Sequence, residues 1–137
     1  MITSSELVKN LPLLFAALFV AILFVQSGLD KVFNYKGNLE WLSGHFSKSL
    51  LNGTVPLMLP VITAMEVATG LLCGVGVIYF LLTGAAFLIF YGSIVGALAL
   101  TSLFFGQRVA QDYPGAAVLV PYFLLMLLVM YLSMPGR

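Results

Sequence analysis

Hydrophobic residues run along this chain in long stretches that are interrupted at only a few points. The first, LPLLFAALFVAILFVQSGL, is followed at once by charged residues, which predicts a helix over about 11–31. A second stretch, 55–105, stays apolar for 51 residues with Glu66 as its one charged residue. As a single helix it would be about 75 Å long, whereas the hydrocarbon core of a bilayer is about 30 Å thick. The second stretch is therefore expected to fold back once.

Two glycines mark the expected reversal. Gly74 and Gly76, in CGVGVIY at 73–79, allow a tight turn. A polar loop at 106–115 then returns the chain for a last span, which Pro121 is expected to kink. The chain is thus predicted to cross the membrane four times, at about 11–31, 57–75, 79–104 and 115–133.

The one long polar loop, 30–56, contains a helical pattern of its own. Trp41, the only tryptophan, lies in it, and apolar residues recur at helical spacing at Leu39, Leu42, Phe46 and Leu50. This pattern predicts a short helix that lies at the membrane surface. Asn38 could cap its start, and NGT at 52–54 supplies the turn before the next span.

The composition narrows the class of protein. Of 137 residues, 61% are hydrophobic and 8% are charged, whereas a soluble domain carries about a quarter charged residues. The expected fold class is an all-α membrane protein, a single domain built as a four-transmembrane-helix bundle with a short interfacial helix in the first loop. The net charge is +1 and the six Lys and Arg residues are scattered, which excludes the basic patch that nucleic-acid binding requires.

Two residues that occur only once limit the redox chemistry. Cys73 has no second cysteine for a disulfide or a Cys-x-x-Cys pair, so the chain cannot carry out dithiol chemistry by itself. His45 is the only histidine, and the two axial histidines of a membrane haem cannot come from one. Neither a metal site nor a covalently bound cofactor is expected.

The orientation in the membrane stays open. An even number of spans places the first and third loops on the same side, and these loops carry four of the six Lys and Arg residues. That excess favours a cytoplasmic position for them. The number of Lys and Arg residues in the loops does not indicate the orientation if Lys31 and Arg108 are held in a binding site.

Glu66 is the most informative residue, because it is the one ionisable group near the middle of a predicted span. An isolated charge there costs several kcal/mol, so such residues are protonated, paired or in contact with water. Thr63, Gly70 and Cys73 lie on the same face of the helix, three, four and seven residues from Glu66. This small and polar stripe is predicted to face the interior of the bundle.

The end of the first span carries a matching set of polar or small residues, namely Gln26, Ser27, Gly28, Asp30 and Lys31. Gly28 lets another helix come close, and the long side chain of Lys31 makes it the natural counter-ion for Glu66. A second interpretation is equally open. In it, Asp30 and Lys31 only mark the membrane boundary, and Glu66 is a protonated hydrogen-bonding group between helices.

Small residues recur four apart at two places in the spans. GSIVG at 92–96, in the third span, and GLLCG at 70–74, in the second, favour close packing of helices. In the third loop, Arg108 and Asp112 are also four apart and lie on the same side as Lys31. They either close the mouth of a shared cavity or form a solvated surface pair.

Four of these residues carry a family resemblance. Gly28 and Lys31, in FVQSGLDKVFN, and Glu66 followed by Gly70 match the pattern of the DoxX family of small four-span bacterial membrane proteins, which the chain resembles in layout over nearly its whole length. The resemblance implies a multi-pass protein of the bacterial inner membrane. It also implies a link to membrane redox processes, since the family includes a thiosulfate–quinone oxidoreductase subunit and proteins found with terminal oxidases.

The leading hypothesis is a redox-associated membrane protein that binds a quinone or a similar lipophilic molecule between its helices. The candidate pocket residues are Lys31, Glu66, Gln26, Gly28, Thr63 and Gly70. A non-catalytic accessory or scaffold subunit of a respiratory or sulfur-oxidising membrane complex is the alternative. The expected partners are membrane lipid and either a membrane redox protein or further copies of the chain in a homo-oligomer. A carrier of ions or small molecules is a third possibility, suggested by the acid within the membrane.

Overall fold

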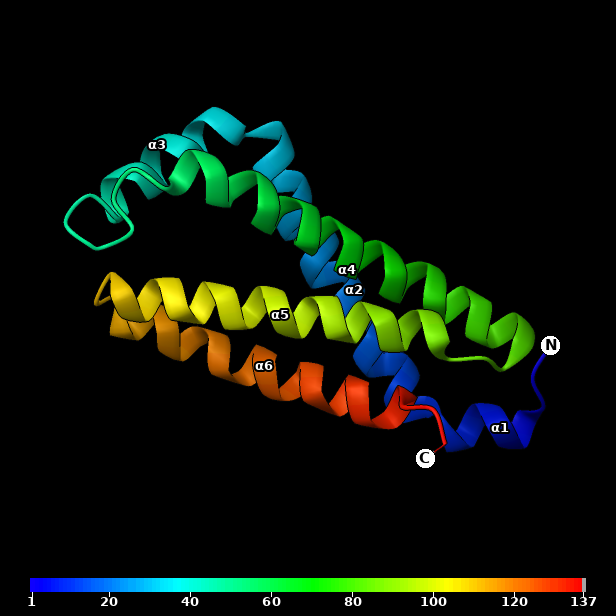
Figure 1. Ribbon diagram of the computed structural model, residues 1–137. Coiled ribbons are helices and arrows are strands. Elements are labelled where there is room, and N and C mark those ends of the chain that lie inside the picture. Colours follow the sequence, from blue (N-terminus) through cyan, green and yellow to red (C-terminus); the bar gives the residue numbers. More distant parts are fainter. Residues whose placement is uncertain (137) are drawn as a thin grey trace.

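The computed structural model describes residues 1–136, which form an all-α structure (Figure 1). Its helices are α1 (Ser4–Lys9), α2 (Leu11–Phe33), α3 (Tyr35–His45), α4 (Val55–Thr83), α5 (Phe87–Val109) and α6 (Tyr113–Ser133). Four of these, α2, α4, α5 and α6, are long and apolar enough to cross a membrane. The predicted four-span bundle with a short helix between the first two spans is confirmed.

The four long helices form a closed ring of contacts. α4 packs against α2 and α5, α5 packs against α6, and α2 completes the ring by contacting α6. In Figure 1, α4, α5 and α6 run side by side while α2 crosses behind them. α3 lies at the same end of the bundle as the turn between α5 and α6, and α1 lies at the opposite end. The core fills the ring with buried apolar side chains, among them Ala17, Val20, Phe24, Cys73, Ile89, Ala99, Met126 and Val129.

The predicted reversal at 73–79 is wrong, because α4 continues through it to Thr83. The chain turns instead at Gly84, whose φ of 79° is in the left-handed region that glycine adopts without strain. Gly76 serves helix packing: a Cβ there would lie 2.9 Å from the backbone nitrogen of Ile89 in α5. The third span accordingly begins at 87 rather than 79.

The short helix also differs in detail from its prediction. Asn38 lies within α3 and not at its start, and its side-chain amide donates to the carbonyl oxygen of Asn34 at 2.9 Å. α3 ends at His45, so the segment up to 54 is turns rather than helix. The turn expected at 52–54 is confirmed by the positive φ of Gly53.

Close approach of α2 and α4 depends on two glycines. A Cβ on Gly28 would lie 2.7 Å from Cγ2 of Val67. A Cβ on Gly70 would lie 2.6 Å from Cγ2 of Val25 and 2.7 Å from its backbone nitrogen, so backbone as well as side chain would have to move. Gly74, one turn further along α4, differs, because its Cβ would make an ordinary 3.6 Å contact with Ala21.

This difference predicts opposite effects of two alanine substitutions on one helix. Gly70→Ala is expected to lower the free energy of unfolding by about 1–3 kcal/mol, because the helices must separate to fit the methyl group. The matched control Gly74→Ala is expected to leave it unchanged or raise it by up to about 1 kcal/mol through better helix propensity. The fully buried Cys73 supplies the measurement, since a thiol-reactive maleimide dye labels it only on unfolding. Equal losses in the two variants would contradict this packing.

Candidate functional site

Lys31 and Glu66 form an ion pair between α2 and α4. Nζ of Lys31 lies 3.0 Å from Oε1 and 3.3 Å from Oε2 of Glu66, and it also donates to Oγ of Ser27 at 3.0 Å. The Glu66 side chain is 1% exposed and that of Lys31 is 17% exposed. The predicted counter-ion is confirmed, so Lys31 does more than mark the membrane boundary.

The geometry of the pair follows from the helix contact beside it. Gly28 packs against Val67, the neighbour of Glu66, and the two backbones are therefore close enough for the stem of Lys31 to reach inward. A carboxylate buried among apolar helices is tolerated because this ammonium compensates it. Oε1 of Glu66 nevertheless receives no well-directed hydrogen bond from any residue in 1–136, so the carboxylate keeps unused acceptor capacity.

The polar stripe on α4 faces inward as predicted. Thr63, Glu66, Gly70 and Cys73 are all buried. The Thr63 hydroxyl donates to the carbonyl oxygen of Leu59 at 2.7 Å, within its own helix, and so does not extend the ion pair. Glu66, paired with Lys31 of α2, is therefore the one residue of this stripe that remains a candidate functional group.

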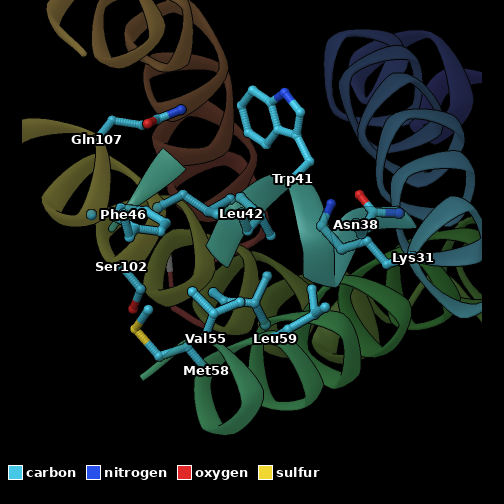
Figure 2. Close-up of a pocket in the computed structure, with 13 residues that line it drawn as sticks. Lys31, Asn38, Trp41, Leu42, Phe46, Val55, Met58, Leu59, Ser102 and Gln107 are labelled. Carbon is cyan, nitrogen blue, oxygen red and sulfur yellow. The ribbon is translucent and has the colours of Figure 1, made fainter. Parts of the chain in front are cut away.

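A mostly apolar pocket of about 270 Å³ lies next to the ion pair, enclosed by α3, α4 and α5. Figure 2 shows Lys31 and Asn38 on one side of it and Gln107 on the other. The wall between them is built from Trp41, Leu42, Phe46, Val55, Met58, Leu59, Ile62, Ser102, Leu103 and Gly106. The pocket thus combines an apolar slot with hydrogen-bonding groups at two separate places.

Only one of the six predicted pocket residues lines this pocket, namely Lys31. Glu66 lies behind it as its counter-ion, and Gly28 serves the contact between α2 and α4. Gln26 and Gly70 line a different groove, on the outer face of the same helix pair. The sequence therefore identified the ion pair, but it grouped residues that face two sides of α2.

The predicted mouth residues have separate partners. The guanidinium of Arg108 stacks over the ring of Tyr113, 4.5 Å from its centroid. Asp112 accepts a hydrogen bond from the backbone nitrogen of Gly115 at 3.0 Å and so caps α6. Neither residue lines the pocket, whose polar side near this loop is formed by Gln107.

A histidine cluster holds α3 against the bundle. Nε2 of His45 lies 2.8 Å from Oε1 of Gln107 and 3.5 Å from Oδ2 of Asp112. The ring of His45 also stacks on that of Trp41, with centroids 4.7 Å apart. Sequence reasoning considered His45 only as a haem ligand. Its actual role is to join the helix that covers the pocket to α5 and the loop after it.

The wall supplied by α3 was the main feature that the sequence analysis missed. Leu42 and Phe46 were read as the apolar face of a surface helix, whereas they pack with Val55 and Leu59 of α4. The signal that could have found this was Gly106 near the end of α5, because Phe46 lies over it, 3.4 Å from where its Cβ would be. An apolar stripe fits a neighbouring protein surface as well as it fits a lipid surface.

The chain matches no protein-family model, no curated protein and no solved structure. Within residues 1–136, no three or more His, Cys, Asp and Glu side chains are grouped so that they could hold a metal ion. Its function is therefore inferred from the ion pair and the pocket beside it.

The ion pair predicts an asymmetry between its two partners. Lys31→Met is expected to lower the free energy of unfolding by about 3–5 kcal/mol, because it leaves the fully buried Glu66 carboxylate alone. Glu66→Gln is expected to cost only about 1–2 kcal/mol, since the Lys31 ammonium can turn towards water on its flexible stem.

The double variant Lys31→Met/Glu66→Gln serves as the control. It is expected to be more stable than Lys31→Met alone, because no unpaired charge remains in the core. Labelling of Cys73 during unfolding measures the free energy of unfolding of all three variants and of the wild type. Equal losses in the single variants, or additive losses in the double variant, would show that the two groups do not form a coupled pair.

Proposed function

We propose that this membrane protein binds a quinone, or a similar lipophilic molecule with carbonyl acceptors, in the pocket between α3, α4 and α5. The single observation that carries the proposal is an apolar slot between α3, α4 and α5 with Lys31 at its edge. Ligand sites of small molecules have this composition, with a few placed polar groups in an otherwise apolar lining.

The donors at the two sides of the pocket fit the two carbonyls of a quinone ring. The Lys31 ammonium has three N–H groups, and Ser27 and Glu66 are its acceptors in the chain, so one N–H can serve a ligand. Gln107 uses its Oε1 on His45, and its Nε2 makes no hydrogen bond to residues 1–136. The volume of about 270 Å³ suits a ring rather than a long tail, which would extend into lipid.

The ion pair of Lys31 and Glu66 would help to supply the pocket with protons. Reduction of a quinone to the quinol takes up two electrons and two protons. The Lys31 ammonium, whose side chain is partly exposed, would donate one of these protons to the ring oxygen beside it. The Glu66 carboxylate would favour its reprotonation, and water would supply both this replacement and the second proton. The electrons would come from another protein of the membrane.

The resemblance to the DoxX family supports the same proposal. Its four matched residues lie in one place: Gly28 and Gly70 permit the contact of α2 and α4, and Lys31 and Glu66 pair within it. We accordingly propose a DoxX-like protein of the bacterial inner membrane, acting in a respiratory or sulfur-oxidising process. This likeness is an analogy for function, and the pocket is the physical argument.

A non-catalytic subunit of a redox complex is the second candidate, and one observation favours it. In the most apolar stretch of α6, 17% of the residues are buried, against 44% in that of α2. α6 therefore offers the largest uncovered apolar face to a neighbouring protein. Purification in mild detergent separates the two candidates. Reproducible co-purification of a redox enzyme whose activity is insensitive to Lys31→Ala would favour the subunit.

Binding can be measured through Trp41, because the only tryptophan of the chain lines the pocket. A short-chain ubiquinone analogue is expected to quench its fluorescence saturably when added to the protein in lipid nanodiscs. Gln107→Leu is expected to weaken binding at least about five- to tenfold, because it removes a hydrogen bond to the ligand and also the contact with His45 that holds α3 over the pocket. Ser102→Phe is expected to abolish saturable quenching, because the added ring fills the pocket.

The matched control is Thr101→Phe, which adds the same ring one residue away, where the side chain lines a different groove. It is expected to bind like the wild type. Quenching that never saturates, or that is identical in the wild type and Ser102→Phe, would mean that the analogue only dissolves in the lipid and would overturn the proposal.

A further inference from the structure

A second groove lies on the outer face of the bundle, where α2 crosses α4. It has a volume of about 920 Å³ and faces away from the pocket described above. Its walls are apolar and exposed, with Ile22 and Leu29 on α2 and Leu71, Val75 and Ile78 on α4. One amide, that of Gln26, lies among these side chains.

Gln26 is unlike the other polar residues of the spans. Its side chain is exposed on the groove and makes no hydrogen bond to residues 1–136. It lies one turn deeper in α2 than Asp30, about 6 Å along the axis from the charged end of the helix. In hydrocarbon, an amide without a partner is unfavourable, because no water is present to bond its donors and its acceptor.

We infer that a second copy of this chain covers the groove, related by a two-fold axis that passes close to Gln26 along the membrane normal. An amide both donates and accepts, so the same amide from the second copy satisfies it, whereas a lipid acyl chain offers neither group. Such a contact is isologous: each copy presents the same surface to the other. Ala21 and Gly74, which also line the groove, leave room for the two copies to approach.

This interface leaves the ligand pocket open. Lys31 lines the inner pocket, whereas its neighbour Asp30 lines the outer groove with Gln26. The dimer therefore does not rest on the proposed quinone binding, and the two can fail separately.

The test measures Förster transfer between donor- and acceptor-labelled copies in liposomes as the protein is diluted with lipid. The wild type is expected to lose transfer as the ratio of lipid to protein rises. Gln26→Leu is expected to shift the midpoint of this loss about three- to twentyfold, towards weaker association. Gln26→Asn is expected to restore most of the affinity, because it keeps the amide. Gln107→Leu is the matched control: it also removes an amide, but one that does not line the groove, so the midpoint of the transfer should stay that of the wild type.

A disulfide cross-link shows which face of the bundle forms the dimer interface. Ile22→Cys, on the groove, is expected to give a disulfide-linked dimer in oxidised membranes, and the added change Gln26→Leu should reduce its yield. Leu124→Cys, equally exposed on α6, should give none. Native Cys73 is fully buried and does not interfere. Transfer that is unchanged by Gln26→Leu, monomers at every dilution, or a tightly bound lipid that is lost with the amide would each overturn the proposal.

Discussion

The contact between α2 and α4, and the ion pair that it encloses, is the constraint on which the rest of the structure depends. Gly28 and Gly70 bring the two backbones together, so that the ammonium of Lys31 comes within 3.0 Å of the Glu66 carboxylate. Without that ammonium, a charge in the middle of a span would be strongly unfavourable. The same pairing holds the head of Lys31 at the edge of the pocket. Helix packing, charge compensation and the shape of the site therefore form one unit.

The span pattern and the ion pair could be predicted because both leave local signals in the sequence. A spanning helix needs an apolar length, and a lone mid-span acid needs a partner, for which Lys31 was the candidate at the end of the preceding span. The reversal at 73–79 could not be predicted in the same way. Glycine favours a tight turn and a close helix contact alike, and only the packing of Gly76 on α5 shows which applies, while Gly84 makes the turn.

The membership of the pocket was harder to predict, because it depends on helix rotation and on contacts distant in sequence. Gln26 and Lys31 are five residues apart, about 140° around a helix, so they face different neighbours. The wall formed by α3 meets Gln107 of α5 through His45, and these two residues are 62 positions apart in the chain. A residue spacing cannot reveal such a contact. The packing of the apolar stripe of α3 on α4 could not be predicted for the same reason, since the stripe carries no mark of its partner.

The most direct measurement of the central claim is a density map of the purified protein in lipid with a short-chain quinone bound. The account predicts ring-shaped density between Lys31 and Gln107, beneath α3, with the Lys31 ammonium still paired to the Glu66 carboxylate. A map in which this pocket is empty while the quinone lies elsewhere on the bundle would contradict it. So would a map in which Lys31 turns away from Glu66 into water.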